Sequence, residues 1–219
     1  MPAEITLEEV PPLDGTLWQW GNAESGSASY CRFFDDGYMM YIHELPFPDG
    51  SAISAYNIGF PWKCEGFNVT FNFSGNTFQG YFVNKDFINA KNKNNPLVRV
   101  TDKAVLEKYG ESFHFSPMSV LPGRGKFIQG SGSKVEIFNS NDYFVAAAIV
   151  TPESAGYLLL PPGRGETIDV PDGNYDVYFV YSTEPESLYQ GDSFSVRQQK
   201  MTITIQLIED GNYGVKKVR

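Results

Sequence analysis

Residues 67–74 of this chain read FNVTFNFS, and this stretch decides the fold class. Phe67, Val69, Phe71 and Phe73 alternate with polar residues, so one side of the segment is apolar and the other is polar. Successive side chains of a β-strand point to opposite faces, whereas those of a helix repeat about every 3.6 residues. The stretch therefore predicts a half-buried β-strand that packs on a core through its apolar side.

The alternation continues on both sides of this stretch. Downstream, a Ser-Gly-Asn turn at 74–76 leads to a second strand, where Phe78 and Phe82 continue the apolar face. Upstream, Asp35-Asp36-Gly37 separates the two strands of a β-hairpin at residues 30–34 and 38–43. Further strands are expected at residues 17–20, 53–58, 62–64 and 97–100. Tight Gly-bearing turns between such segments are typical of an antiparallel meander.

Two further features complete the first half. Thr101 or Asp102 is placed to cap a short helix near 101–109, since both side chains accept hydrogen bonds from the first turn of a helix. Residues 1–12 are acidic, end in Pro11-Pro12 and are expected to form an extended arm.

The second half starts after an irregular segment, residues 113–132, that is rich in Pro, Ser and Gly. Alternation or short apolar runs then mark about seven strands, a spacing typical of a β-sandwich. They are expected at residues 134–139, 143–150, 157–160, 166–170, 175–181, 194–196 and 201–208. We therefore expect an all-β chain in two domains: an antiparallel meander barrel over residues 13–116 and a seven-stranded β-sandwich over residues 117–219.

Both halves resemble known families. The opening LDGTLW at residues 13–18, with the hairpins that follow, resembles the lipocalin-like small β-barrels over roughly residues 13–100. The segments LPPG at 160–163 and VPDGNYDV at 170–177 resemble transthyretin-like or immunoglobulin-like sandwiches, in which a turn precedes a Tyr-rich strand. The second resemblance implies a fold and no activity, because these residues encode turn chemistry.

Aromatic residues of the first half are the candidate ligand-binding set. If they line the lumen of the barrel, they can hold a small apolar ligand; the alternative is that they fill a solid core. The candidates are Trp18, Trp20, Trp62, Phe67, Phe71, Phe78 and Phe82.

Candidate protein contacts lie in the second half. Tyr175 and Tyr181 share one face of a predicted strand, and Tyr is favoured at interfaces. Arg124 and Arg164 each stand in a Gly-Arg-Gly turn, where an arginine is exposed and available for a contact.

No spacing of residues reaches the level of a catalytic or metal-binding motif. Asp35, Asp36, His43 and His114 are the least implausible catalytic participants, but Asp-Asp-Gly is ordinary turn material. The calcium-like spacing of Asp172, Asn174 and Asp176 lacks the Gly and the Glu that complete such a loop. We expect no metal and no cofactor. Cys31 and Cys64 are either two reduced thiols or one disulfide.

Charge and hydropathy restrict the partners. The net charge is −9 and the pI is about 4.7, so the surface repels phosphate backbones and nucleic-acid binding is not expected. No apolar run approaches the roughly 20 residues of a membrane span. Without a signal-peptide pattern at the start, we expect a soluble cytoplasmic protein, or a secreted or periplasmic one if a leader has been removed.

These observations favour a non-enzymatic binding or interaction protein that acts through a protein partner, as a homo-oligomer or within an assembly. A carrier of a small apolar ligand in the barrel is the first alternative, and an enzyme is the less favoured second.

Overall fold

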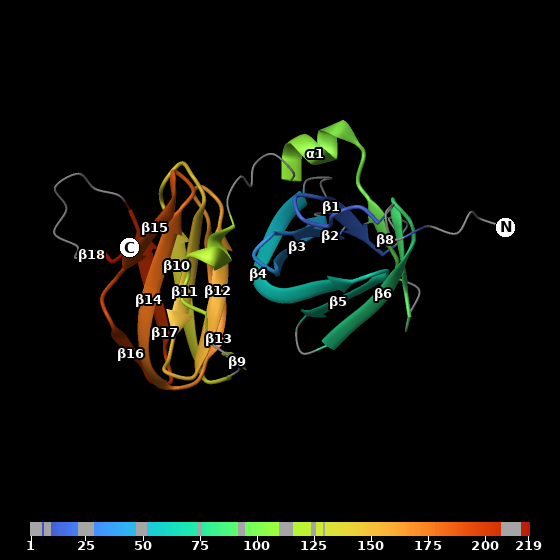
Figure 1. Cartoon of the computed structure of the whole chain (residues 1–219). Coiled ribbons are helices and arrows are strands. Elements are labelled where there is room, and N and C mark those ends of the chain that lie inside the picture. Colours follow the sequence, from blue (N-terminus) through green and yellow to red (C-terminus); the bar gives the residue numbers. More distant parts are fainter. Residues whose placement is uncertain are drawn as a thin grey trace. The chain divides into compact units, whose positions relative to one another are not determined.

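The computed structural model of this 219-residue chain describes residues 6, 10–21, 29–46, 52–73, 76–91, 95–109, 116–123, 126–128, 130–206 and 216–219. The chain divides into two compact units, Met1–His114 and Phe115–Arg219, and each unit is considered by itself. Strands dominate both units, as Figure 1 shows, so the all-β prediction is confirmed.

Unit 1 is a closed antiparallel barrel in which each strand pairs with its neighbours in the sequence and β8 closes back on β1 (Figure 1). The predicted strands at 53–58 and 62–64 are parts of one 14-residue strand, β4. The strands are Leu17–Trp20 (β1), Ser29–Phe33 (β2), Tyr38–Pro46 (β3), Ala52–Glu65 (β4), Asn68–Phe73 (β5), Asn76–Asn84 (β6), Phe87–Ala90 (β7) and Leu97–Arg99 (β8).

The apolar side of the FNVTFNFS stretch faces the inside of this barrel. Val69 and Phe71 are fully buried there with Trp18, Phe82 and Ile88, whereas the intervening Asn68 and Asn72 are exposed. Strand pairing of the barrel thus brings the apolar sides of distant segments together, and much of the lumen is a packed core.

The segment that precedes β1 packs on the barrel core and is hydrogen-bonded to it. Leu13 is buried in the barrel core, and Thr16 donates a hydrogen bond from its hydroxyl to the Leu13 carbonyl. Trp18 Nε1 donates to Thr16 Oγ1 at 2.7 Å, and Trp62 Nε1 donates to the Phe34 carbonyl at 3.0 Å. Two of the three tryptophans therefore have acceptors inside the fold.

The predicted helix is confirmed as α1, Lys103–Tyr109. Asp102 caps it, since its carboxylate accepts from the backbone N–H groups of Ala104 at 2.9 Å and Val105 at 3.2 Å. Tyr109 packs on Tyr30, with ring centroids 5.1 Å apart, which attaches the helix to the outer face of β2. In the described ranges, no helix is long and apolar enough to cross a membrane.

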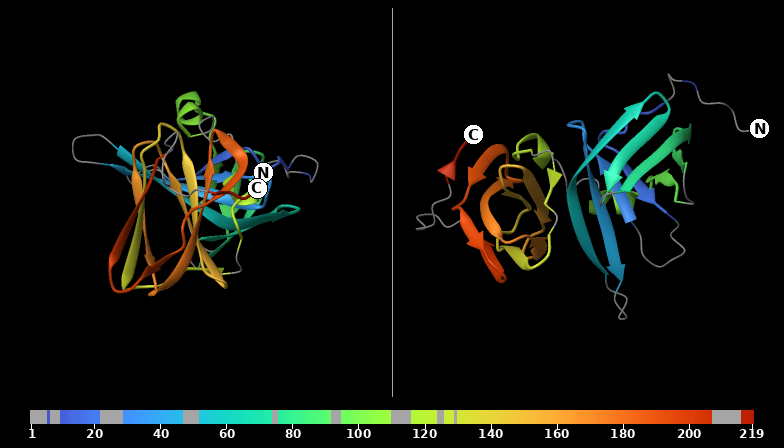
Figure 2. Two further views of the ribbon diagram at one scale, coloured as in Figure 1. Left: turned by 90° about the vertical axis from the view of Figure 1, so that its left-hand side faces the viewer. Right: turned by 90° about the horizontal axis from the view of Figure 1, so that it is seen from below.

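Unit 2 is built from two sheets that enclose one core, and Figure 2 (right) looks along its strands. One sheet has the order β13-β10-β17, and the seven-stranded sheet has the order β18-β15-β14-β11-β12-β9 with β16 paired to β14. The strands are Lys126–Phe127 (β9), Ser133–Asn139 (β10), Val145–Val150 (β11), Ser154–Leu160 (β12), Gly165–Val170 (β13), Gly173–Tyr181 (β14), Glu184–Gln190 (β15), Phe194–Val196 (β16), Lys200–Ile205 (β17) and Lys216–Lys217 (β18); a short 3-10 helix, Pro117–Ser119, precedes them.

The sandwich has more strands than the sequence predicts. β9, β15 and β18 are additional to the seven expected ones, so the number seven needs correction. β9 and β18 are two-residue pairings at the sheet edges, too short to show an alternating pattern. β15 contains Pro185 between two glutamates, a composition that argues against a strand when it is read locally.

Candidate functional site

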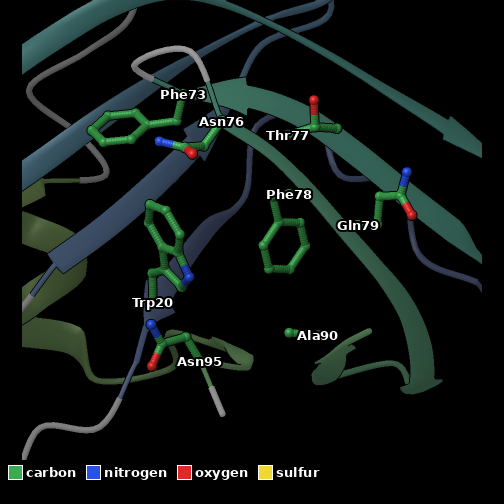
Figure 3. Close-up of a pocket in the computed structure, with 8 residues that line it drawn as sticks. All are labelled: Trp20, Phe73, Asn76, Thr77, Phe78, Gln79, Ala90 and Asn95. Atoms are coloured by element: carbon green, nitrogen blue, oxygen red, sulfur yellow. The ribbon is translucent and has the colours of Figure 1, made fainter. Parts of the chain in front are cut away.

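A pocket of about 430 Å³ opens at the end of the barrel where β1 and β5 finish and β6 begins. We call this the Trp20 end. Apolar rings from three strands form its wall, and polar side chains stand around it (Figure 3). The lining residues are Trp20, Phe73, Asn76, Thr77, Phe78, Gln79, Ala90 and Asn95.

Strand register explains which side chains point into this end. Phe73 pairs with Asn76, and Phe71 pairs with Phe78, so the inward face of β5 continues on β6. Thr77 and Gln79 occupy the alternate positions, and Figure 3 shows them turned away from Trp20. The Asn76 amide thus stands on the same side as the aromatic rings.

The absence of a side chain at Gly80 leaves room for the Phe78 ring. A Cβ atom at position 80 would lie 2.7 Å from Phe78 Cε1 and 2.9 Å from Ile88 Cγ2, both too close for real contacts. The stacked pair of Phe71 and Phe78, with centroids 4.4 Å apart, therefore depends on the missing side chain at position 80.

Trp20 is the central residue of the site. Its indole makes edge-to-face contacts with four rings, at centroid distances of 5.5 Å to Phe71, 5.6 Å to Phe73, 5.6 Å to Tyr41 and 6.1 Å to Phe78. Edge-to-face pairs are a preferred arrangement of aromatic rings and add to the stability from buried area. The indole is therefore held in one orientation before any ligand arrives.

The indole N–H of Trp20 has no hydrogen-bond acceptor within the part of the chain that the structure describes, although its nitrogen is buried. In Figure 3 this nitrogen is turned toward the space between Phe78, Ala90 and Asn95. A buried donor without a partner costs about 1–3 kcal/mol, so an acceptor brought in by a bound molecule recovers that free energy. The site is chemically incomplete at this atom.

A polar cluster supports Trp20 from the β2–β3 side. Ser29 Oγ lies 2.8 Å from the Tyr41 hydroxyl and 2.9 Å from His43 Nδ1, and Ser29 is the strand partner of Trp20. These bonds fix the Tyr41 ring against the indole and against Phe73, whose centroid is 4.4 Å away. Residues 22–28, 47–51, 74–75 and 92–94 lie outside the described ranges.

The predicted ligand-binding residues all contribute to the barrel interior, but not all reach the pocket. Trp20 and Phe78 line the pocket, and Phe71 contacts both rings. Trp18 and Phe82 belong to the filled core, while Trp62 and Phe67 pack against that core from partly buried positions.

Sequence reasoning missed the polar part of the lining. Asn76 and Asn95 resemble turn and loop residues in the sequence, and Ala90 carries no chemical signal. Extending the alternation of Phe78 and Phe82 back by one step would have placed Asn76 on the inward face, where the structure pairs it with Phe73.

The candidate catalytic residues do not converge. Asp35 and Asp36 form the β2–β3 turn, where Asp36 accepts a hydrogen bond from the Tyr38 N–H at 3.0 Å. His43 lies five residues along β3 from Tyr38, the residue that follows the turn, a span of roughly 17 Å. His114 lies outside the described residues. Among those that are described, no group of three or more His, Cys, Asp or Glu side chains is arranged to hold a metal ion.

The structure corrects the protein-contact prediction for two tyrosines. Tyr175 and Tyr181 are only 3% and 5% exposed, and both belong to the core of the sandwich, so they cannot form a contact face of folded unit 2. Arg164 is partly buried in the turn before β13, where its N–H donates to the Pro161 carbonyl at 3.3 Å. Arg124 lies outside the described residues.

The remaining candidates have structural partners. Cys31 and Cys64 are both free thiols; Cys31 is buried, and burial raises the pKa of both. Ser195 donates to Asn174 at 2.7 Å and Ser193 donates to Asp176 at 2.5 Å, as cross-strand pairs of a β-sheet do. Asp172 accepts from Ser133 Oγ at 2.6 Å, so all three residues of the calcium-like spacing have hydrogen-bond partners within unit 2.

No protein-family model, curated protein or solved structure matches this chain. The geometry of the Trp20 end consequently carries the functional argument.

Proposed function

We propose that unit 1 binds a small organic molecule at the Trp20 end, as a lipocalin-like carrier does at the mouth of its barrel. The observation that carries the proposal is the pocket of about 430 Å³ walled by Trp20, Phe73 and Phe78. Ligand pockets commonly measure about 300–1,000 Å³ and combine apolar walls with a few polar groups. The filled far end of the lumen limits the ligand to this end of the barrel.

Ring packing makes the pocket suited to a flat apolar body. Phe73 and Phe78 are only partly buried in the free protein, so a bound ring covers aromatic surface that is otherwise in contact with water. Burial of apolar surface contributes about 25 cal/mol per Å², which is enough for weak binding of a bicyclic molecule. The apolar-ligand alternative from the sequence is thus the function that the geometry favours.

Binding of naphthalene to the full chain tests this function. Saturation-transfer NMR should detect the bound ring, and Ala90→Phe should abolish the signal because Ala90 lines the pocket. Ala104→Phe is the matched control, since it adds the same ring at an exposed position on α1. Unchanged binding by Ala90→Phe, in a protein that remains folded, would place the ligand elsewhere.

Partner binding through unit 2 is a second candidate function. Phe138 is 37% exposed on β10, and in the described part of the sheet its neighbours β13 and β17 form the two edges. Edge strands offer unpaired backbone groups to another chain. Light scattering over a concentration series tests the case in which the partner is a second copy of this chain: a mass that rises with concentration supports it, and a constant monomer mass contradicts it.

A further inference from the structure

We infer that the ligand of the Trp20 end is a neutral ring compound with a hydrogen-bond acceptor that receives the Trp20 indole N–H. This inference rests on the proposed function and specifies its ligand class. It differs from the apolar ligand expected from the sequence, because it assigns one polar contact at a defined atom.

The first argument compares the three tryptophans. Trp18 donates to Thr16 Oγ1 and Trp62 donates to the Phe34 carbonyl, so the fold supplies acceptors at both of these positions. Trp20 Nε1 is buried without an acceptor from any described residue, and it is the tryptophan that lines the pocket. The donor and the cavity occur together, which points to an acceptor on the molecule that enters the cavity.

The second argument concerns charge. Among the described residues that line the pocket there is no Asp, Glu, Lys, Arg or His. A charged group placed between Trp20 and Phe78 would lose hydration without gaining an opposite charge, which is unfavourable. The amide of Asn95 has donors and an acceptor, so it matches a neutral polar group on the ligand.

The third argument concerns rigidity. Four rings surround the indole, and the Tyr41 ring among them is anchored by the hydrogen bond between its hydroxyl and Ser29 Oγ. A donor that is already oriented loses little entropy when it binds, so the hydrogen bond to the ligand contributes most of its strength to affinity.

Quinoline and naphthalene provide a matched pair of probes. The two rings have nearly the same shape, and quinoline replaces one C–H group with a neutral acceptor nitrogen. With the full ¹⁵N-labelled chain, we expect quinoline to bind about tenfold more tightly than naphthalene, because one additional hydrogen bond separates them. Quinoline should also shift the Trp20 indole N–H signal more than the other two indole signals.

Two variants test whether the preference for quinoline comes from the indole nitrogen of Trp20. In Trp20→Phe, quinoline and naphthalene should bind with equal affinity, because the N–H that distinguishes the two probes is removed, whatever the smaller ring does to the binding of both. Trp62→Phe is the matched control and should keep the preference, because the Trp62 N–H is already bonded to Phe34. N-methylquinolinium, a cation without an acceptor, should bind more weakly than quinoline.

The outcomes separate the two proposals. Equal affinity for quinoline and naphthalene, or a preference that persists in Trp20→Phe, overturns the inferred acceptor and leaves ring binding intact. Tighter binding of the cation overturns the inferred neutrality. If neither ring binds at millimolar concentrations, ring binding itself fails, and the inference fails with it.

Discussion

Trp18 and Trp20 lie two residues apart on the same face of β1, yet of these two only Trp18 has an acceptor for its indole N–H among the described residues. Trp18 is fully buried in the barrel core, where its ring contacts Phe82 with centroids 5.9 Å apart. Trp20 faces the pocket. One short strand therefore contributes a structural tryptophan and a binding tryptophan, and their hydrogen bonds distinguish them.

Hydrogen exchange of the three indole N–H groups should reflect this difference. We expect the Trp20 proton to exchange fastest, because no hydrogen bond must break and the residue borders the pocket. The Trp18 and Trp62 protons should be protected by their bonds to Thr16 and Phe34. NMR in deuterated water, with each signal assigned from a Trp→Phe variant, measures the order. Slower exchange at Trp20 than at Trp62 would contradict it.

Thr16→Val should destabilise unit 1 by about 1–3 kcal/mol, because it leaves the buried Trp18 N–H without its acceptor. Valine has almost the same shape as threonine, so the packing is conserved. Urea unfolding followed by tryptophan fluorescence reports on unit 1, since all three tryptophans lie in it. Thr77→Val, at an exposed position, should change the free energy of unfolding by less than about 0.5 kcal/mol.

Strands with one apolar face could be predicted from the sequence, and β5 is the clearest of them. β15 could not, because Glu184, Pro185 and Glu186 give no alternation; it forms because β14 provides a partner, with Phe179 opposite Tyr189. Local pattern predicts a strand where the sequence itself supplies an apolar face. Local pattern does not predict a strand whose formation depends on pairing with a neighbouring strand.

The same limit applies to the sites. Alternation correctly places Tyr175 and Tyr181 on one face of β14, but Tyr178 gives the other face an aromatic residue as well. Only the packing of two sheets shows that Tyr175 and Tyr181 face inward. At the barrel, the aromatic side of the pocket was predictable, whereas the contribution of Asn76 depends on its register with Phe73.

The attachment of α1 predicts a dependence of stability on acid pH. Burial acts to raise the pKa of Glu44, but hydrogen bonds from Lys108 Nζ, at 2.6 Å, and from the Tyr109 hydroxyl outweigh it and lower the pKa. Below about pH 4.5 the unfolded chain binds a proton more readily than the folded one. The stability that Glu44 contributes is therefore present above this range and is lost as the pH falls through the folded pKa.

Glu44→Gln tests this dependence. At neutral pH it should cost about 1 kcal/mol, since Lys108 is half exposed and water screens the pair. The difference from the native chain should shrink as the pH falls through the lowered pKa of folded Glu44, because protonation then removes the charge in the folded state as well. Glu107→Gln is the control, because the Lys103–Glu107 pair is exposed and 3.8 Å long. A loss that is independent of pH would show that charge is not the cause.

Asn139 should be the most sensitive polar residue of unit 2, because it joins both sheets at the end of β10. It is fully buried, and its Nδ2 donates to the carbonyls of Tyr143 at 2.7 Å, Leu160 at 3.0 Å and Pro161 at 3.1 Å. Asn139→Asp keeps the shape, removes these donors and buries a carboxylate, so we expect a loss of about 3 kcal/mol or more. The readout is hydrogen exchange at the buried amides of β11, which should become faster. Asn174→Asp, exposed and bonded to Ser195, is the control and should leave those amides unchanged. If Asn139→Asp also leaves exchange at the β11 amides unchanged, the three hydrogen bonds from Asn139 Nδ2 do not contribute to the stability of unit 2, and apolar packing holds the sheets together.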